Sequence, residues 1–405
     1  MDALITPLNW QRVRLGDMTT SFTKQTGFDY SASIKPTLIK EQLPNYIPFI
    51  QNKDFSGHYI NYKTDYFIPN EIAIRFPQIL LNEKCLLISI VGSIGNVAVF
   101  NHSQDAFTGC AIAVLKFKEK KSLDFVMHFL MSASGQKSLL NIVKASSHKS
   151  IILADLRDLL IPLPPLNEQI AIANILSGLD HYLYSLRALI LKKESVKKAL
   201  SFELLSQRKR LKGFNQAWQR VRLGDVGKPC MCKRVMKHQT TRYGEIPFYK
   251  IGTFGNTADA FISKKLFLEY KTKYSFPKKG DILISASGTI GRAVIYDGKP
   301  AYFQDSNIVW IDNDETLVKN DFLFYAYSHV KWNTEHTTIL RLYNDNFRNT
   351  LIPLPPLNEQ IAIANILSAL DHEIISLKNK KRQFENIKKA LNHDLMSAKI
   401  RVLKK

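Results

Sequence analysis

The residues able to carry chemistry are scattered along the chain and form no catalytic motif. No G-x-S-x-G elbow precedes a predicted helix, and no Cys–His–Asn framework is evident. The strings Gly92–Gly95 and Gly288–Gly291 lack the third glycine of a dinucleotide fingerprint and the Lys-Ser or Lys-Thr of a phosphate-binding loop, so we interpret them as turns between strands. Leu-Pro-Pro-Leu lacks the residues that flank an amino-methyltransferase motif. We therefore assign no catalytic residue.

A metal ion or other cofactor is not expected either. Asp281, Asp297 and Asp305 are close in sequence, but they stand beside turns without the Glu-x-Lys partner that a nuclease uses. The Cys-Met-Cys segment has no second pair of Cys or His at the spacing of zinc ligands. We expect reduced thiols at all four cysteines, Cys85, Cys110, Cys230 and Cys232.

Side chains suited to nucleic-acid binding occur in equivalent places, just upstream of two Pro-rich helix starts and just after the two glycine strings. Arg, Lys, Asn and Gln hydrogen-bond base edges, whereas Ser, Thr and Lys contact phosphates. For each residue the alternative is an ordinary solvated loop. The basic runs 207–212 and 378–382 are interpreted as solvated helix surface or linker. The candidate DNA-binding residues are Ser147, Lys149, Asn96, Thr289, Arg292, Arg341, Tyr343 and Asn344.

Composition favours a polyanionic partner. The 405 residues suggest two or three domains, and 45% hydrophobic residues are enough for real cores. Lys and Arg number 56 against 35 Asp and Glu, which gives a net charge of +21. No signal peptide and no apolar run of about 18 residues is present, so we expect a cytoplasmic protein without a membrane partner.

The chain repeats itself. The segment LIPLPPLNEQIAIANILS occupies Leu160–Ser177 and recurs unchanged at Leu351–Ser368, 191 residues later. WQRVRLGD occurs at Trp10–Asp17 and at Trp218–Asp225, 208 residues apart. Between these markers only weak echoes survive, such as ISIVGSIGNVAVF beside ISASGTIGRAVIY. We infer a tandem duplication of a module with a variable part followed by a constant part.

Each variable part has the pattern of a mixed α+β domain. Short runs rich in Ile, Val and aromatics, broken by Gly, Asn and Asp, predict strands. These runs are Cys85–Val91, Val97–Phe100, Ala111–Phe117, Asp281–Ser285 and Ile308–Ile311. Helical spacing with few breakers predicts helices at Ser122–Ser132 and Asn320–Val330.

Each constant part predicts one long helix, the first from Asn167 to about Leu205. Pro164 and Pro165 fit only before or at the first turn. Apolar residues then recur in heptad steps, a pattern that predicts a coiled coil between the two helices. The alternative is that each helix packs on its own domain. The expected interface residues are Ile172, Leu176, Leu179, Leu183, Leu186, Ile363, Leu367, Leu370, Ile374 and Leu377.

The apolar pattern falters at four lysines, Lys193, Lys197, Lys381 and Lys388. If the halves are related by a pseudo-twofold axis, the helices run antiparallel and their length acts as a spacer between two domains.

A variable domain that opens with W-x-x-V-R-L-G-D, contains GDILISASGTIG at Gly280–Gly291, ends in IPLPPLNEQ and leads into a long helix, all in tandem, resembles the specificity subunit of type I restriction-modification systems. The resemblance implies two target-recognition domains, each reading half of a split double-stranded DNA site. It also implies an antiparallel helix pair that sets their spacing. It further implies docking of two methyltransferase subunits and, through them, of restriction subunits. It supplies no catalytic residue.

One departure concerns the first half, which has Glu83-Lys-Cys-Leu where the second has Gly280-Asp-Ile-Leu. The expected fold is α+β, with two pseudo-symmetric target-recognition domains separated by two long antiparallel helices. The expected segments are a first recognition domain at 1–161, a central helical region at 162–213, a second recognition domain at 214–352 and a C-terminal helical region at 353–405.

Two alternatives to a non-catalytic DNA reader and scaffold remain at this point. One is an independent DNA-cleaving enzyme. The other is a coiled-coil interaction protein without sequence-specific DNA binding.

Overall fold

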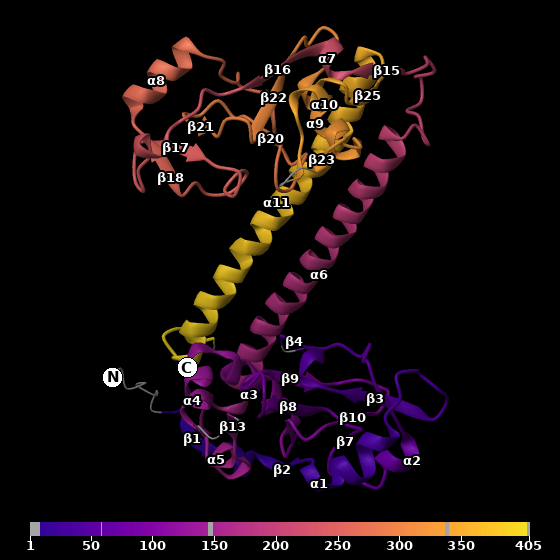
Figure 1. Ribbon diagram of the computed structural model, residues 1–405. Coiled ribbons are helices and arrows are strands. Elements are labelled where there is room, and N and C mark those ends of the chain that lie inside the picture. Colours follow the sequence, from indigo (N-terminus) through magenta and orange to yellow (C-terminus); the bar gives the residue numbers. More distant parts are fainter. Residues whose placement is uncertain (1–8, 58, 145–148, 337–339, 403–405) are drawn as a thin grey trace. The chain divides into compact units, whose positions relative to one another are not determined.

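The computed structural model describes residues 9–57, 59–144, 149–336 and 340–402, which fold into two compact units. Unit 1 contains the described residues up to Arg187 and those from Lys380 onward. Unit 2 is Ala188–Asn379. Each unit therefore combines one α+β domain with the first part of one long helix and the last part of the other (Figure 1). The four expected segments remain a prediction, because the units cut across both helical regions.

The same four-stranded antiparallel sheet occurs in both units. Its two middle strands are almost wholly buried, since they are short runs of Ile, Leu, Val and Ala that pack on both faces. In unit 1 its order is β2 (Thr19–Lys24), β11 (Ile112–Phe117), β8 (Cys85–Ser89) and β9 (Val97–Phe100). In unit 2 its order is β16 (Gly227–Met231), β22 (Ile308–Asn313), β19 (Ile282–Ser285) and β20 (Ala293–Ile295). The predicted strands are confirmed.

A second, smaller sheet in each unit is built around one parallel strand pair. In unit 1 it contains β6 (Phe67–Pro69), β3 (Tyr46–Ile50), β10 (Ala106–Thr108) and β7 (Leu80–Leu81), with β3 and β10 parallel. In unit 2 it contains β18 (Ala260–Ile262), β17 (Ile246–Tyr249) and β21 (Tyr302–Phe303), with β17 and β21 parallel. The segment after β10 or β21 leads directly into the middle strand of the larger sheet.

In each unit a helix that follows the larger sheet in sequence packs against it. The helix α3 (Leu123–Met131) lies beside β8 and β9 in Figure 1, and seven of its nine residues are buried. Its counterpart α9 (Asn320–Ala326) packs against β19 and β20 and continues into the short helix η7 (Tyr327–His329). The two predicted domain helices are confirmed.

The most strongly repeated sequences pair with each other. In unit 1, β1 (Gln11–Arg14) lies antiparallel to β14 (Leu160–Leu163). In unit 2, β15 (Gln219–Arg222) lies antiparallel to β25 (Leu351–Leu354) in the same register. The WQRVRLGD and LIPLPPL segments are therefore two strands of one ladder, which holds the start of each domain beside the start of each long helix.

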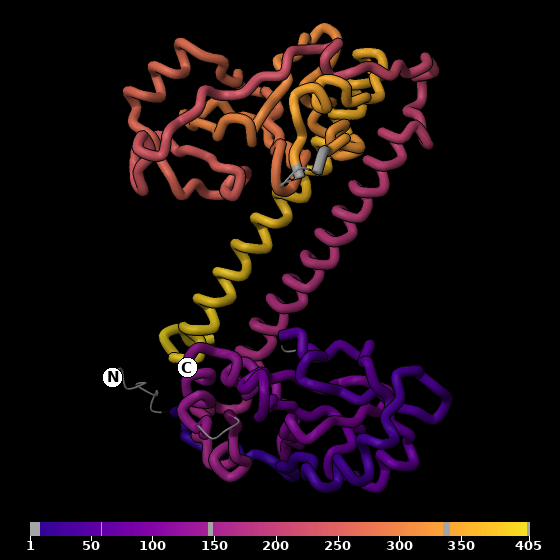
Figure 2. Tube along the Cα trace, in the orientation of Figure 1, coloured from indigo at the N-terminus to yellow at the C-terminus, as the bar shows by residue number. Residues whose placement is uncertain are grey.

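The long helices are α6 (Leu166–Leu205) and α11 (Leu357–Met396), each of 40 residues. Both begin immediately after the two prolines, as predicted from the missing N–H and fixed φ of proline. In each unit the first part of one helix runs antiparallel to the last part of the other. Figure 2 shows the yellow end of α11 beside the first domain and the start of α6. The predicted fold class is confirmed.

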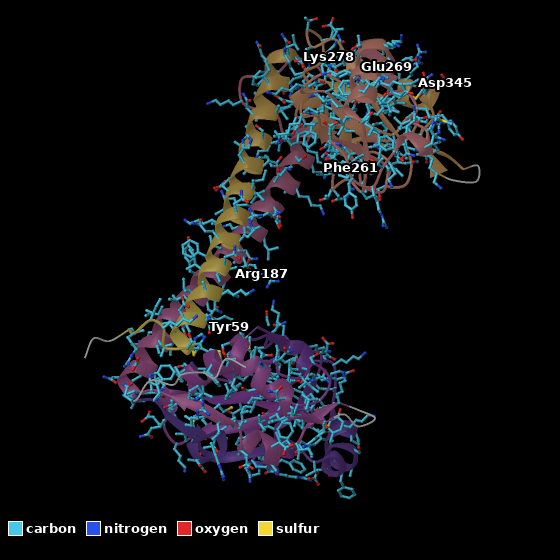
Figure 3. The ribbon with its side chains drawn as sticks, turned by 90° about the vertical axis from the view of Figure 1, so that its left-hand side faces the viewer. Tyr59, Arg187, Phe261, Glu269, Lys278 and Asp345 are labelled. Carbon is cyan, nitrogen blue, oxygen red and sulfur yellow. The ribbon has the colours of Figure 1, made fainter. Side chains whose placement is uncertain are left out.

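A small hairpin ties the first domain to α6. Its strands are β4 (Phe55–Ser56) and β5 (Tyr59–Ile60). The ring of Tyr59, labelled in Figure 3, lies 6.0 Å from the ring of His181 and 6.0 Å from that of Tyr184. Burial raises the pKa of the Tyr59 hydroxyl to about 12, so it is a neutral hydrogen-bonding group at physiological pH.

Candidate DNA interface

Three loops of unit 2 meet where the middle strand β19 ends and the middle strand β22 begins. They are the glycine turn Ser287–Arg292, the segment Gln304–Asn307 and the segment Arg341–Tyr343. The Ala286 N–H donates to the Asn307 carbonyl at 2.7 Å, and the Leu342 N–H donates to the Ala286 carbonyl at 2.9 Å. We call this arrangement the three-loop cluster of unit 2.

Unit 1 has the same cluster, made from Val91–Asn96, Gly109–Ala111 and Lys149–Ile151. The Ile90 N–H donates to the Ala111 carbonyl at 2.9 Å, and the Ile151 N–H donates to the Ile90 carbonyl at 2.9 Å. An isolated bridge joins Val91 to Ser150, as another joins Ser287 to Arg341 in unit 2. The loops expected to bind DNA are therefore brought together in each unit by the same backbone hydrogen bonds.

The glycine strings form tight turns between strands, as the sequence predicts. Gly288 and Gly291 have φ values of 66° and 82°, and Gly92 and Gly95 have values of 78° and 86°. Residues other than glycine rarely adopt this left-handed region of φ. A β-carbon on Gly291 would also lie 2.1 Å from the Trp332 Nε1 atom. The residues that directly follow these tight turns, Asn96 and Arg292, are exposed on the surface of the cluster.

The two arginines predicted in unit 2 are each anchored to a backbone carbonyl. Arg341 is half-buried, and its Nη2 donates to the Ser306 carbonyl at 2.9 Å. The exposed Arg292 donates from Nη1 to the Phe254 carbonyl at 2.8 Å. A guanidinium has five N–H donors, so a single backbone bond orients each arginine and leaves most of its fork for another acceptor.

The other predicted residues of unit 2 lie on the surface of the same cluster. Thr289 is exposed at the tip of the glycine turn. Tyr343 is exposed with its ring 6.0 Å from the Arg341 guanidinium, and the exposed Asn344 begins the short helix α10 (Asn344–Arg348). All five predicted residues of unit 2 therefore gather at one place.

Among the predicted residues that the structure describes, unit 1 has one charged side chain at the equivalent place, where unit 2 has two arginines. Asn96 is exposed directly after the glycine turn, and Lys149 is exposed in the segment before the Pro-rich helix start. Ser147 lies outside the described residues. The sequence did not single out Asn52, whose Nδ2 donates to the Val91 carbonyl at 2.6 Å and holds the turn. No local signal identifies it, because the bond joins segments 39 residues apart.

The two units also differ in the segment just before β8 and β19, where the sequences of the two halves depart from each other. Asp281 closes the turn before β19, where its carboxylate accepts from the Lys278 N–H at 2.7 Å. In unit 1 Glu83 instead forms ion pairs with Lys116 at 3.4 Å and Lys120 at 2.8 Å. The hydrogen bond from Lys120 lowers the pKa of the Glu83 carboxyl below its ordinary value. A side-chain ion pair thus stands where unit 2 has a capped turn.

The expected interface residues of the long helices are buried to different degrees. Four are fully buried in the core of a domain, together with the end of the other helix, and these are Ile172, Leu176, Ile363 and Leu367. Leu186 and Ile374 are buried farther along the helices. The remaining four are half-buried, namely Leu179, Leu183, Leu370 and Leu377. The first turns of each helix therefore pack both on their own domain and against the end of the other helix.

Most of the lysines that interrupt the apolar pattern have acidic partners on the other helix. In unit 2, Lys193 pairs with Glu373 at 2.9 Å and Lys197 with Asp371 at 2.5 Å. In unit 1, Lys388 pairs with Asp180, a residue only 5% exposed. Lys381 instead pairs within its own helix with Glu385 at 2.8 Å. The interruptions are positions where oppositely charged side chains meet.

Two further arginines have a role that no pattern in the sequence indicates. Arg210 forms a two-pronged ion pair with Glu359 at 2.9 and 2.8 Å, and Arg401 forms the same pair with Glu168 at 2.7 and 2.9 Å. Both glutamates are buried. The run 207–212, interpreted as solvated helix surface or linker, follows the end of α6, and Arg210 within it is an ion-pair partner because the chain turns back there and brings it to the start of α11.

Within the described ranges, no group of His, Cys, Asp and Glu side chains could hold a metal ion. All four cysteines are free thiols, and burial raises the pKa of Cys85 and of Cys232 to about 12. Thiols that remain protonated at physiological pH are poor nucleophiles. No described helix is long and apolar enough to span a bilayer.

Comparison with known protein families gives the same two-part division. A model of the type I restriction modification DNA specificity domain matches residues 7–193 and matches again at residues 215–386. The chain belongs to the type I restriction-modification DNA specificity family. Its relatives are specificity subunits, which are non-catalytic, so the alternative of an independent nuclease is rejected.

Individual members of the type I specificity family resemble the chain over most of its length. A putative specificity subunit of Haemophilus influenzae is 44% identical over 270 residues, covering 64% of this chain and 67% of that protein. The putative MjaX specificity subunit of Methanocaldococcus jannaschii is 30% identical over 330 residues, 76% of each chain.

Two solved structures share the fold. The type I S subunit from M. genitalium has a TM-score of 0.63 at 17% identity and covers 97% of both chains. A chain from a study of complex assembly and conformational transition in the type I R-M system has a TM-score of 0.55 at 18% identity. It covers 96% of this chain and 98% of that one.

Proposed function

We propose that the chain recognises a split DNA site, with the three-loop cluster of each unit contacting one half. The observation that carries this proposal is that one backbone arrangement occurs in both units with different side chains. Unit 2 presents Arg292 and Arg341, whereas unit 1 presents Asn96 and Lys149. A constant frame with variable contact residues suits two different base sequences.

Net charge supplies the part of the affinity that does not depend on sequence. A charge of +21 attracts the phosphate backbone and releases counterions from it. This attraction weakens steeply as salt is added. The anchored arginines of unit 2 then add selectivity, because a bidentate arginine contact to guanine discriminates by about 1–3 kcal/mol.

In this proposal the long helices set the distance between the half-sites and receive the partner subunits. Each helix of 40 residues is about 60 Å long at 1.5 Å per residue. Each helix carries an exposed isoleucine near its start, Ile175 at 40% on α6 and Ile361 at 42% on α11, although the two do not occupy equivalent positions of the repeat. We infer that two methyltransferase subunits cover these exposed positions and that restriction subunits join through them, because exposed apolar side chains on a helix favour a protein partner.

The direct test is to co-express the chain with its cognate methyltransferase subunit and to map DNA methylation on a plasmid library. We expect two fixed half-sites around a constant gap. Arg341→Ala should relax one half-site by about 1–3 kcal/mol in discrimination and leave the other unchanged. Lys149→Ala should weaken the contribution of the other half. Arg341→Lys separates charge from geometry, because lysine keeps the charge and loses the planar fork.

The matched control is Lys273→Ala, which removes one positive charge from α8 (Lys264–Lys273), outside both clusters. It should leave both half-sites intact. Simultaneous loss of both half-sites in Arg341→Ala would contradict separate reading by the two units. Binding without any preference among sequences would instead support the coiled-coil interaction protein.

A further inference from the structure

The two long helices have similar sequences, but they differ at some of the positions where one helix contacts the other. A residue of α6 and the residue 191 positions later on α11 occupy equivalent places in the repeat. Asp180 is thus equivalent to Asp371, and Lys197 to Lys388. Both helices carry this acid and this lysine.

The shared pair specifies direction and register. Asp180 pairs with Lys388 in unit 1, and Asp371 pairs with Lys197 in unit 2 at 2.5 Å. The Tyr325 hydroxyl also donates to Asp371 at 2.8 Å. In a parallel arrangement the two aspartates would face each other, and like charges at one level repel. This pair does not favour pairing of α6 with α11 over pairing of either helix with a second copy of itself, because two copies of α6 or two copies of α11 could form it equally well.

A second pair of positions differs between the units. In unit 1 the rings of Tyr182 and Phe384 lie 4.7 Å apart. The equivalent positions in unit 2 are Glu373 and Lys193, which form an ion pair at 2.9 Å. One level of the helix pair is therefore aromatic, and its counterpart is ionic.

This difference is complementary only when α6 meets α11. Two antiparallel copies of α6 would place Tyr182 of each copy against Lys193 of the other. Two copies of α11 would place Glu373 against Phe384, which leaves a carboxylate beside an aromatic ring and without its lysine. Discrimination of this kind uses contacts that favour the correct partner together with mismatches that penalise the wrong one.

We propose that α6 and α11 recognise each other, and not second copies of themselves, through the Tyr182–Phe384 contact and the Lys193–Glu373 ion pair. The contacts lie within the units and need no DNA. Their biological consequence rests on the proposed function, since they would keep two different DNA-reading domains on one frame and prevent exchange between chains.

The test compares two full-length variants with identical composition and charge at the four positions. The mismatched variant is K193F/F384K, which breaks both contacts between α6 and α11 and creates complementary contacts for self-pairing. The matched variant is Y182E/K193F/E373Y/F384K, which exchanges the aromatic and ionic pairs between the units and keeps α6 complementary to α11. Thermal unfolding and mass by light scattering are measured for both and for the unchanged chain of 46.3 kDa.

We expect the mismatched variant to unfold about 2 to 4 °C lower, or to gain a species of twice the mass, while the matched variant behaves like the unchanged chain. Should the mismatched variant fail to fold, a folded matched variant still supports the proposal. Equal unfolding temperature and mass in the mismatched variant and the unchanged chain would overturn it. Equal loss in both variants would also overturn it, because individual residues and not their pairing would then matter. Since neither readout involves DNA, failure here leaves the proposed function untouched.

Discussion

Asp281 is a buried carboxylate, and its burial disfavours the charged form. It is 6% exposed, and burial raises the pKa of its carboxyl above the ordinary value of 3.8, although the Lys278 N–H donates to it. A carboxyl with a raised folded-state pKa reduces stability once both states are ionised. This cost is absent below the ordinary pKa and is complete above the folded-state pKa.

Asp281→Asn should therefore stabilise unit 2 at neutral pH, because the amide oxygen can still accept from Lys278 without bearing a charge. We expect a gain of about 2 to 4 °C in the unfolding temperature, which corresponds to about 1 kcal/mol. The gain should vanish as the pH falls below 3.8. Unfolding followed by circular dichroism between pH 3 and 7 checks this prediction.

Asp297→Asn is the matched control at an exposed turn. There the Lys299 N–H donates to the carboxylate and lowers its pKa, so the charge helps the folded state. This variant should show no gain at neutral pH. A similar gain in both variants would mean that removing any negative charge is sufficient.

At the scale of residues, the sequence predicts the chemical character of the candidate interface but not its support. Arg292 and Arg341 stand out because arginine can hydrogen-bond base edges, and these two lie beside a glycine turn and just before a helix start. Asn52 and Asn307 do not, since their importance comes from bonds to Val91 and Ser287 across long stretches of chain. Such bonds depend on the packed fold and have no local pattern.

Among the elements, the start of each long helix is held by an arginine that arrives from the far end of the other helix. Glu168 is 3% exposed and pairs with Arg401, whereas Glu359 is 1% exposed and pairs with Arg210. Glu359 also accepts from the Trp218 Nε1 at 2.9 Å. Removing one partner of a buried ion pair leaves an uncompensated charge.

Arg401→Ala should therefore destabilise unit 1 by about 2 to 3 kcal/mol, somewhat below the loss at a fully buried pair because the Arg401 side chain is 34% exposed. Arg210→Ala should destabilise unit 2 less, since Trp218 still binds Glu359. Chemical denaturation with hydrogen exchange resolved by peptide distinguishes the two units.

Lys209→Ala serves as the control, because that side chain is 68% exposed next to Arg210. It should change stability little. Loss of protection in unit 2 upon Arg401→Ala, with unit 1 unaffected, would contradict the assignment of each arginine to its unit.

The prolines and the heptad pattern predict that the two long helices exist, but they predict only part of how the helices contact each other. The sequence marks Lys193, Lys197 and Lys388 as interruptions because a one-dimensional pattern treats a lysine as polar. Only the antiparallel register shows that each lysine meets an acid, and register depends on where both chain segments lie. The same limit hid the role of Arg210.

On the scale of the whole molecule, both helices pass from one unit to the other between Arg187 and Ala188 and between Asn379 and Lys380. Every helix–helix ion pair described above lies within one unit. Seven residues of helix-forming sequence inserted at both points would therefore preserve all of these pairs. A heptad adds about 10.5 Å, the length of about three base pairs of B-DNA.

If the helices act as a spacer, the doubly extended chain should recognise the same half-sites with a gap about three base pairs longer. Methylation mapping measures the gap directly. Insertion into α6 alone is the control, since unequal helices cannot keep both sets of pairs and should lose methylation. An unchanged gap after the double insertion would contradict the spacer role.

The division of unit 1 between two distant stretches of sequence has a consequence for synthesis on the ribosome. Leu395 and Met396 belong to the core that contains Trp10 and Phe125, yet they are translated only after the whole of unit 2. At about 5–20 residues per second, the first domain waits about 10 to 40 s for the segment that completes it. Nascent chains therefore expose an unfinished apolar surface while the second unit folds, and chaperones that bind such surfaces should associate with the first domain before the second.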